Sequence, residues 1–157
     1  MTIVTARRFA CGIALLGALG SARSLYAQIG IGTWVRKSTA SMPGTMTMTV
    51  EGCCHGGRRL SYHIDINGTE TLLTVESRFD GSEAPVLMAG KPSAETMAIK
   101  RVDTHHTIAV VKMNGKPFGT SKGTLSADGR TLTVINDYTS SAGGQAVGKY
   151  TEVWVRR

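Results

Sequence analysis

The chain has 157 residues and a formal net charge of +7 at pH 7, with 18 lysine and arginine residues against 11 aspartate and glutamate residues. The basic residues stand singly or in pairs, without a basic stripe or interleaved aromatic side chains, and this pattern disfavours nucleic-acid binding. The length suits one domain with one core, so we expect no internal domain boundary.

The first 27 residues have the composition of a secretory signal peptide. Arg7 and Arg8 supply a positive start, and the apolar run Phe9–Gly20 is too short to cross a bilayer as a permanent helix. Small residues then lead to Ala27, after which we expect cleavage; cleavage after Ala22 and a retained membrane anchor are the alternatives.

Cleavage leaves residues 28–157 as a single mature domain. Its net charge is +4, because three arginines leave with the signal peptide and 15 basic residues remain against 11 acidic ones. We therefore expect a periplasmic or secreted protein, with no stable membrane insertion after cleavage.

The mature chain alternates apolar and polar residues with the period of a β-strand, between turn signals at short intervals. Asn67-Gly68 and Asn114-Gly115 accept the positive φ angles that two-residue hairpin turns require. A longer loop is expected at Ala89–Ala94. The expected strands are Thr33–Lys37, Thr45–Glu51, Arg59–Ile66, Thr69–Phe79, Ala84–Met88, Thr96–Val102, His105–Met113, Lys116–Ser126, Thr131–Asp137 and Gly148–Val155.

These nine or ten strands predict an all-β fold, an antiparallel up-and-down β-barrel that closes on itself. Closure removes the exposed strand edges that would otherwise promote aggregation. Methionines and small hydroxyl residues on the inner faces are compatible with a barrel that encloses space for a ligand or water. The alternative is that the threonines simply line the solvent face, where their strand propensity suffices.

Gly32-Thr33-Trp34 resembles the Gly-x-Trp signature of the calycins, the lipocalin and fatty-acid-binding group, in which the tryptophan plugs the closed end of the barrel. The last strand, Tyr150–Arg156, resembles the closing strand of fatty-acid-binding proteins. A closer likeness is to exported bacterial lipocalin-like proteins, which combine Gly-Thr-Trp with segments similar to Gly90–Asp103 and Leu125–Val134. The resemblance covers Ile31–Arg157 and implies a calycin-like barrel.

The closing strand also departs from that group. Fatty-acid-binding proteins commonly place an arginine and a tyrosine, two positions apart, on its inner face to hold a carboxylate. Glu152 and Trp154 occupy the corresponding positions here. A negative charge would repel a fatty-acid headgroup, so the fatty-acid mechanism is not expected.

The most unusual local sequence is Cys53-Cys54-His55, which falls in an expected hairpin loop. In an oxidising compartment the two cysteines can form a disulfide with each other, pair across two molecules, or bind a metal with His55. The spacing lacks the gap typical of zinc sites, so we expect no metal and favour a loop disulfide. His105 and His106 point to opposite faces if they lie on a strand, which makes a shared ion unfavourable.

No catalytic motif stands out, so we expect no enzymatic activity and no cofactor. The favoured function is the binding of a small hydrophobic or amphipathic molecule. The alternatives are a structural or interaction barrel with a filled interior, disulfide-linked through Cys53 or Cys54, and a small enzyme with a buried carboxylate, histidine and arginine. The oligomeric state is left open. The expected ligand contacts are apolar at Trp34, Met46, Met48, Tyr62 and Trp154, and polar at Arg36 and Glu152.

Overall fold

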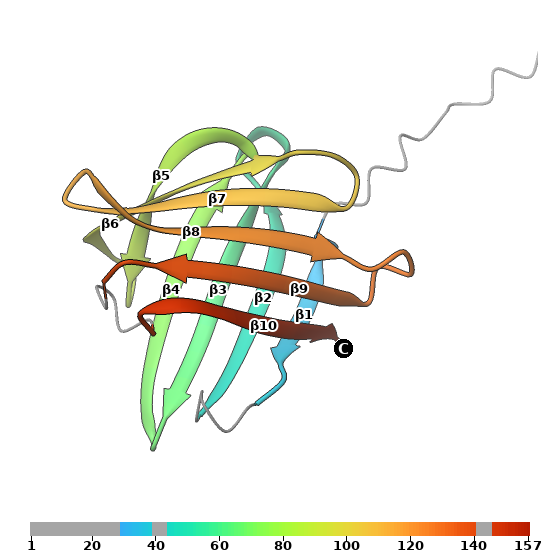
Figure 1. Cartoon of the computed structure of the whole chain (residues 1–157), viewed down its shortest axis with the longest axis horizontal. Coiled ribbons are helices and arrows are strands. Elements are labelled where there is room, and N and C mark those ends of the chain that lie inside the picture. The colour runs from blue at the N-terminus through green and yellow to red at the C-terminus, as the bar shows by residue number, and fades with distance from the viewer. Residues whose placement is uncertain (1–28, 39–43, 141–145) are drawn as a thin grey trace, which may run out of the picture.

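A computed structural model describes residues 29–38, 44–140 and 146–157, so the expected signal peptide lies outside the described residues, as do parts of the links before Thr45 and after Ser140. Ten strands in the described part form one closed antiparallel barrel in which chain neighbours pair, and the first strand pairs with the last (Figure 1). This confirms the predicted up-and-down barrel. The strands are β1 (Gly32–Arg36), β2 (Thr45–Cys53), β3 (Gly57–Ile66), β4 (Thr69–Ser77), β5 (Asp80–Met88), β6 (Lys91–Arg101), β7 (His106–Met113), β8 (Lys116–Leu125), β9 (Thr131–Tyr138) and β10 (Gly148–Arg156).

Both Asn-Gly pairs form hairpin turns as predicted. Asn67 and Gly68 have φ angles of 53° and 80°, and Asn114 and Gly115 have 50° and 77°. A third turn of this kind, with φ angles of 48° and 77°, occurs at Ala89-Gly90. The expected loop Ala89–Ala94 is therefore wrong, and β6 begins at Lys91, five residues before the expected start. Alanine rarely adopts a positive φ, so the pair Ala89-Gly90 does not indicate a two-residue hairpin turn in the sequence.

Strand β5 is also longer than expected, because it begins at Asp80 and not at Ala84. Its pairing with β6 shifts register between Asp80 and Glu83 and again between Pro85 and Leu87. Proline has no N–H to donate and is tolerated at such irregularities. The sequence predicts a shorter strand because Asp80-Gly81 indicates a turn that ends the preceding strand, whereas both residues belong to β5.

One end of the barrel is closed by a buried core around Trp34. The indole is 0 % exposed, and its Nε1 donates a hydrogen bond of 3.1 Å to the Gly30 carbonyl. The core includes Val50, Leu60 and Trp154, which come from three other strands. Sheet alternation explains this packing, since all four residues share the inner face of the barrel.

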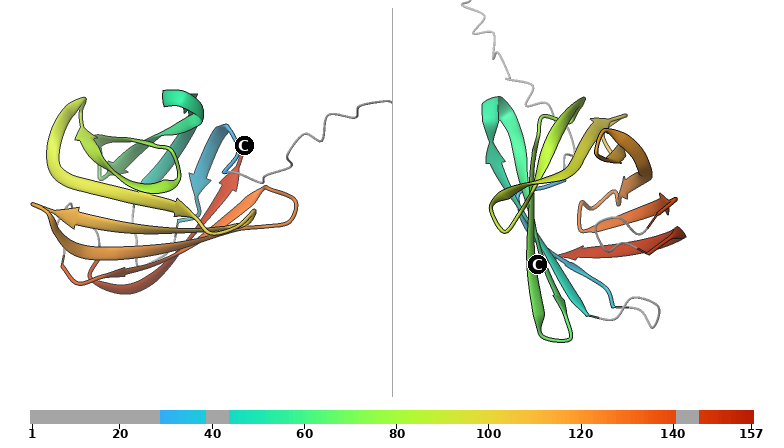
Figure 2. Two further views of the ribbon diagram at one scale, coloured as in Figure 1. Left: turned by 90° about the horizontal axis from the view of Figure 1, so that it is seen from above. Right: turned by 90° about the vertical axis from the view of Figure 1, so that its left-hand side faces the viewer.

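The barrel closes where β1 and β10 meet. The paired residues are Trp34 with Arg156, Val35 with Val155 and Arg36 with Trp154. Further bonds extend this seam, including one of 2.6 Å from Arg156 Nη2 to the Ile31 carbonyl. Figure 2 shows the first strand lying beside the C-terminal end of the chain. Among the described residues, no helix has the length and apolar character needed to cross a membrane.

Candidate functional site

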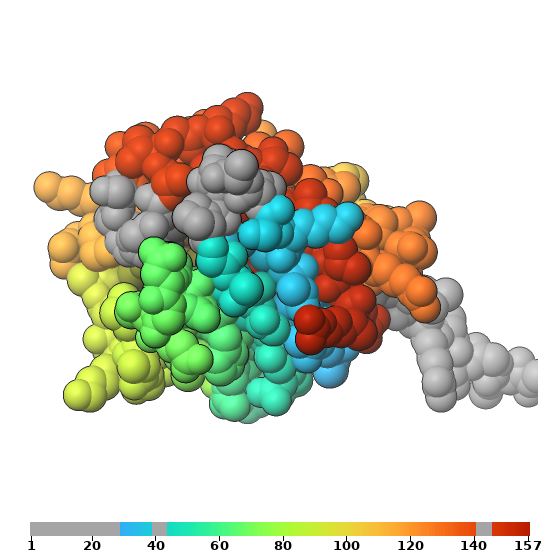
Figure 3. Space-filling model, turned by 90° about the horizontal axis from the view of Figure 1, so that it is seen from below, coloured from blue at the N-terminus to red at the C-terminus, as the bar shows by residue number. Residues whose placement is uncertain are grey.

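The barrel encloses a cavity of about 550 Å³. Ile66 and Met88 line it at the end opposite Trp34, and they are 47 % and 43 % exposed, so among the described residues the cavity reaches solvent at this end. Figure 3 views the molecule from the side of the β3–β4 turn, where the early strands (blue to green) face the last strands (orange to red). The cavity therefore has a closed end at the Trp34 core and a mouth near the hairpin turns after β3 and β5.

Most of the cavity wall is apolar. The alternating inner positions of nearly every strand contribute side chains to it, because residues two apart point to the same face of a strand. The apolar lining residues include Met46, Met48, Leu60, Ile64, Leu73, Val75, Val86, Met97, Ile99, Ala109, Leu132, Val134 and Trp154. Such a wall favours the hydrocarbon part of a ligand over water.

Four side chains on adjacent strands form a hydrogen-bonded polar row, which consists of Arg36, Glu152, Asn136 and Ser121. Arg36 Nη1 donates to Glu152 Oε1 at 3.2 Å, and Asn136 Nδ2 donates to Glu152 Oε2 at 3.3 Å. Ser121 Oγ donates to Asn136 Oδ1 at 2.6 Å. The Arg36 and Glu152 side chains are only 7 % and 13 % exposed, so each charge is compensated within the barrel.

Glu95 also faces the cavity, from the inner face of β6, where Met97 and Ile99 follow at alternate positions. It is 4 % exposed. Within the described part of the chain, no group donates a hydrogen bond to its carboxylate or forms an ion pair with it. Burial raises the pKa of Glu95, because the charged form loses its hydration.

Three tyrosines also line the cavity: Tyr62 beside the closed-end core, and Tyr138 and Tyr150 farther from it. The rings of Tyr138 and Tyr150 stack with centroids 6.0 Å apart, and Tyr62 meets Trp154 edge to face at 6.0 Å. Burial is the main cause that raises the pKa of Tyr62, Tyr138 and Tyr150. The three phenols therefore stay neutral at physiological pH and offer hydroxyl groups and aromatic faces to a ligand.

The residues expected from the sequence to contact a ligand mostly lie together. Arg36, Met46, Met48, Tyr62, Glu152 and Trp154 line the cavity. Trp34 does not: its side chain is buried in the core that closes one end of the barrel.

Sequence reasoning missed Glu95, Ser121, Asn136, Tyr138 and Tyr150. The sequence contains a pattern that indicates Glu95, because this residue alternates with Met97 and Ile99. The strand predicted from the sequence begins at Thr96, however, and so excludes Glu95. For Ser121 and Asn136, only the register between β8 and β9, which pairs them directly, reveals their relation.

The sulfur atoms of Cys53 and Cys54 are bonded to each other, next to the short 3₁₀ turn Cys54–Gly56. Ligating atoms of Cys53, Cys54 and Glu76 lie within 4.8 Å of one another. A metal would need thiolates, which the disulfide does not supply, and Glu76 accepts a 2.6 Å bond from Arg59. In this form neither cysteine is available for a disulfide between two molecules.

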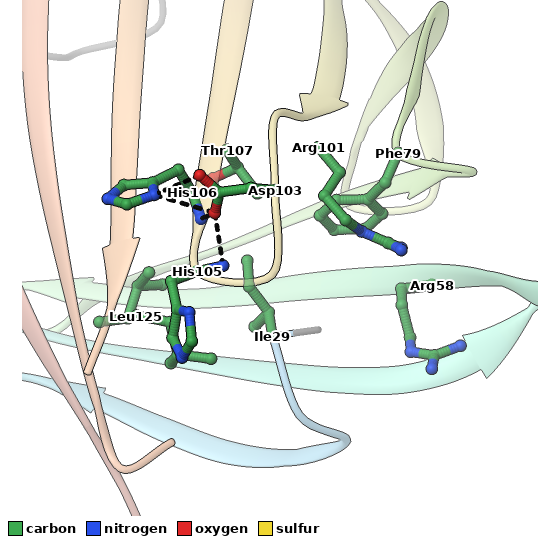
Figure 4. A pocket seen from close by; sticks show the side chains of 10 residues that line it. Ile29, Arg58, Phe79, Arg101, Asp103, His105, His106, Thr107 and Leu125 are labelled. Atoms are coloured by element: carbon green, nitrogen blue, oxygen red, sulfur yellow. Dashed lines mark hydrogen bonds and ion pairs between the residues drawn. The ribbon is translucent and has the colours of Figure 1, made fainter. Parts of the chain in front are cut away.

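A second hollow of only about 10 Å³ lies at the closed end (Figure 4). The Asp103 carboxylate there accepts hydrogen bonds from the backbone N–H groups of His105 and His106 at 2.7 and 2.8 Å, and it lies 2.8 Å from His106 Nδ1. His105 Nδ1 instead lies 2.9 Å from Thr104 Oγ1. The hollow has room for about one water molecule, so it is not a ligand site.

Neither a protein-family model nor a curated protein matches this sequence. The fold and the chemistry of the barrel interior are therefore the basis for a functional assignment. Of the two hollows described, only the large cavity has the size of a small-molecule site.

Proposed function

We propose that this chain is an exported, lipocalin-like binding protein that holds a small, partly apolar molecule inside its barrel and does not act as an enzyme. The observation that carries the proposal is the cavity of about 550 Å³ with a mouth at one end. Small-molecule sites in proteins commonly measure roughly 300–1,000 Å³ and combine apolar walls with a few placed polar groups.

The distribution of lining residues supports an amphipathic ligand. The cavity floor is apolar, with Leu60 and Trp154 beside the Trp34 core. Glu95 and Tyr138 lie nearer the mouth, because Glu95 pairs with Met113, the last residue of β7, and Tyr138 is the last residue of β9. A ligand with a hydrocarbon end and a polar end would place the hydrocarbon end at the apolar floor and the polar end near the mouth.

The two alternative functions fit this interior less well. A structural barrel with a filled interior would leave no cavity of this size. An enzyme of the kind considered above would bring a histidine to the buried carboxylates and arginine, and none of the described lining residues is a histidine.

Binding can be tested with N-phenyl-1-naphthylamine, a neutral dye whose emission rises in apolar surroundings, excited directly so that protein tryptophans do not interfere. We expect saturable binding to the wild type. In Ala109→Trp the added indole occupies part of the cavity, and we expect dye affinity to fall at least about tenfold.

The matched control is Ile108→Trp, which adds the same indole at the neighbouring position on the outer face of β7, where Ile108 is 41 % exposed. This variant should bind the dye like the wild type. Absence of dye binding to the wild type, or equal loss in both variants, would contradict the proposal.

A further inference from the structure

The charges inside the cavity do not balance. Three charged side chains line it in the described part of the chain: Arg36, Glu95 and Glu152. Arg36 and Glu152 are paired at 3.2 Å and together carry no net charge. Ionised Glu95 therefore gives the interior a net negative charge, although the mature chain as a whole is basic.

Glu95 has the features of an anchor whose partner comes from outside the protein. Its side chain is 4 % exposed, it faces the cavity, and no described residue bonds to its carboxylate. A carboxylate that is removed from bulk water and has no partner in the protein loses hydration that a bound cation or cavity water must replace. A cation placed in the cavity would supply the missing partner.

The surroundings of Glu95 suit an organic cation in particular. Glu95 pairs with Met113 of β7 and lies two positions before Met97 on β6. Both methionines pack against the cluster that contains Tyr138, so the carboxylate and this phenol line the same part of the cavity. The ring of Tyr138 stacks with that of Tyr150, and both line the cavity. Aromatic faces attract ammonium groups through cation–π interactions.

We infer that the ligand is an amphipathic organic cation whose protonated amine pairs with Glu95 beside Tyr138, while its hydrocarbon part lies among Met48, Leu60 and Trp154. The inference rests on the proposed binding function and specifies its ligand class. An anionic amphiphile such as a fatty acid would instead bring a second negative charge next to Glu95.

The test uses three ligands with the same ten-carbon chain and different headgroups: decylamine, decanol and decanoate. Each is used below its micelle concentration at pH 7.5 to displace N-phenyl-1-naphthylamine from the processed protein. We expect decylamine to bind at least about tenfold more tightly than decanol, and decanoate to bind most weakly.

Glu95→Gln keeps the size of the side chain and removes its charge. We expect the ratio of decylamine affinity to decanol affinity, measured by displacement of the same dye, to fall most of the way to one in this variant. The control is Glu70→Gln, which makes the same charge change on an exposed residue of β4 and should keep the preference.

The outcomes separate the two proposals. Equal binding of decylamine and decanol to the wild type, or an undiminished preference in Glu95→Gln, would overturn the cation assignment while leaving the binding function standing. If neither the dye nor any of the three ligands binds, the binding function itself fails, and the cation assignment fails with it.

Discussion

At the scale of single residues, Glu95 and Arg36 show two ways of placing a charge inside a barrel. Arg36 is compensated by Glu152 at 3.2 Å, and the pair is further tied to Asn136. Glu95 has no such partner among the described residues. A buried charge without a partner in the protein is characteristic of functional sites, where groups that lower the stability of the fold can raise the affinity for a ligand.

This destabilisation gives a pH-dependent prediction for Glu95→Gln. Burial raises the folded-state pKa of Glu95 above its ordinary value. The stability penalty is therefore absent below the unfolded pKa, grows as pH rises from the unfolded to the folded pKa, and is complete above the folded pKa. The variant should melt at the wild-type temperature near pH 4 and roughly 2–5 °C higher near pH 8, by differential scanning calorimetry. The other charged or titratable groups that line the cavity are Arg36, Tyr62, Tyr138, Tyr150 and Glu152.

Glu70→Gln again serves as the control and should leave the melting temperature unchanged at both pH values. If the melting temperature of Glu95→Gln rises as much at pH 4 as at pH 8, ionisation of the Glu95 carboxyl group is not the cause of the rise.

The resemblance to the closing strand of fatty-acid-binding proteins predicts an inner-face position for Glu152 and Trp154, and strand alternation requires only that the two share a face. The sequence did not show that Glu152 would pair with Arg36, since the two lie on the first and last strands and meet only when the barrel closes. Trp34 was assigned to the ligand site because alternation gives the face of a residue and not its depth along the barrel axis.

At the scale of strands, the inner face of β8 explains where part of the cavity comes from. Its lining residues there, Ser121 and Gly123, are small. Gly119, two positions before Ser121, pairs with Tyr138 of β9, and a Cβ atom on Gly119 would lie 2.3 Å from the Tyr138 ring. This glycine therefore allows the tyrosine ring to lie across β8 and to stack with Tyr150.

We predict that Gly119→Ala lowers the free energy of unfolding by about 1–3 kcal/mol, because the ring must move out of its packed position. Urea denaturation measures the effect. Gly52→Ala is the matched control, since a Cβ at that strand position meets only Ile31 Cδ1 at 3.9 Å. Similar losses in both variants would attribute the effect to glycine in general and not to the tyrosine contact.

Strand boundaries were predictable where turn chemistry was explicit, as at Asn67-Gly68 and Asn114-Gly115. They were not predictable at Ala89-Gly90, where alanine adopts a conformation that its side chain disfavours. The pairing of β5 with β6 imposes this turn, and the residues of the turn do not by themselves predict its conformation.

At the scale of the whole molecule, export is the part of the proposal that concerns residues 1–27. We predict that the full chain, produced in a Gram-negative host, is recovered in the periplasm or medium with Gln28 as its first residue. Intact-mass spectrometry of the fractions distinguishes this product from cleavage after Ala22. Recovery of the uncleaved chain in the membrane fraction would instead favour the retained anchor.

The seam between β1 and β10 joins the two extremes of the mature sequence, with Trp34 opposite Arg156. Among the described strands only this pairing completes the ring, so the cavity forms only after β10 has been synthesised. Non-local pairing of this kind slows folding. Under the export proposed above, a chain that has not yet acquired β10 would remain unfolded enough to be threaded through a secretion channel. Deleting residues 154–157, which include every β10 residue paired with β1, should abolish the cavity.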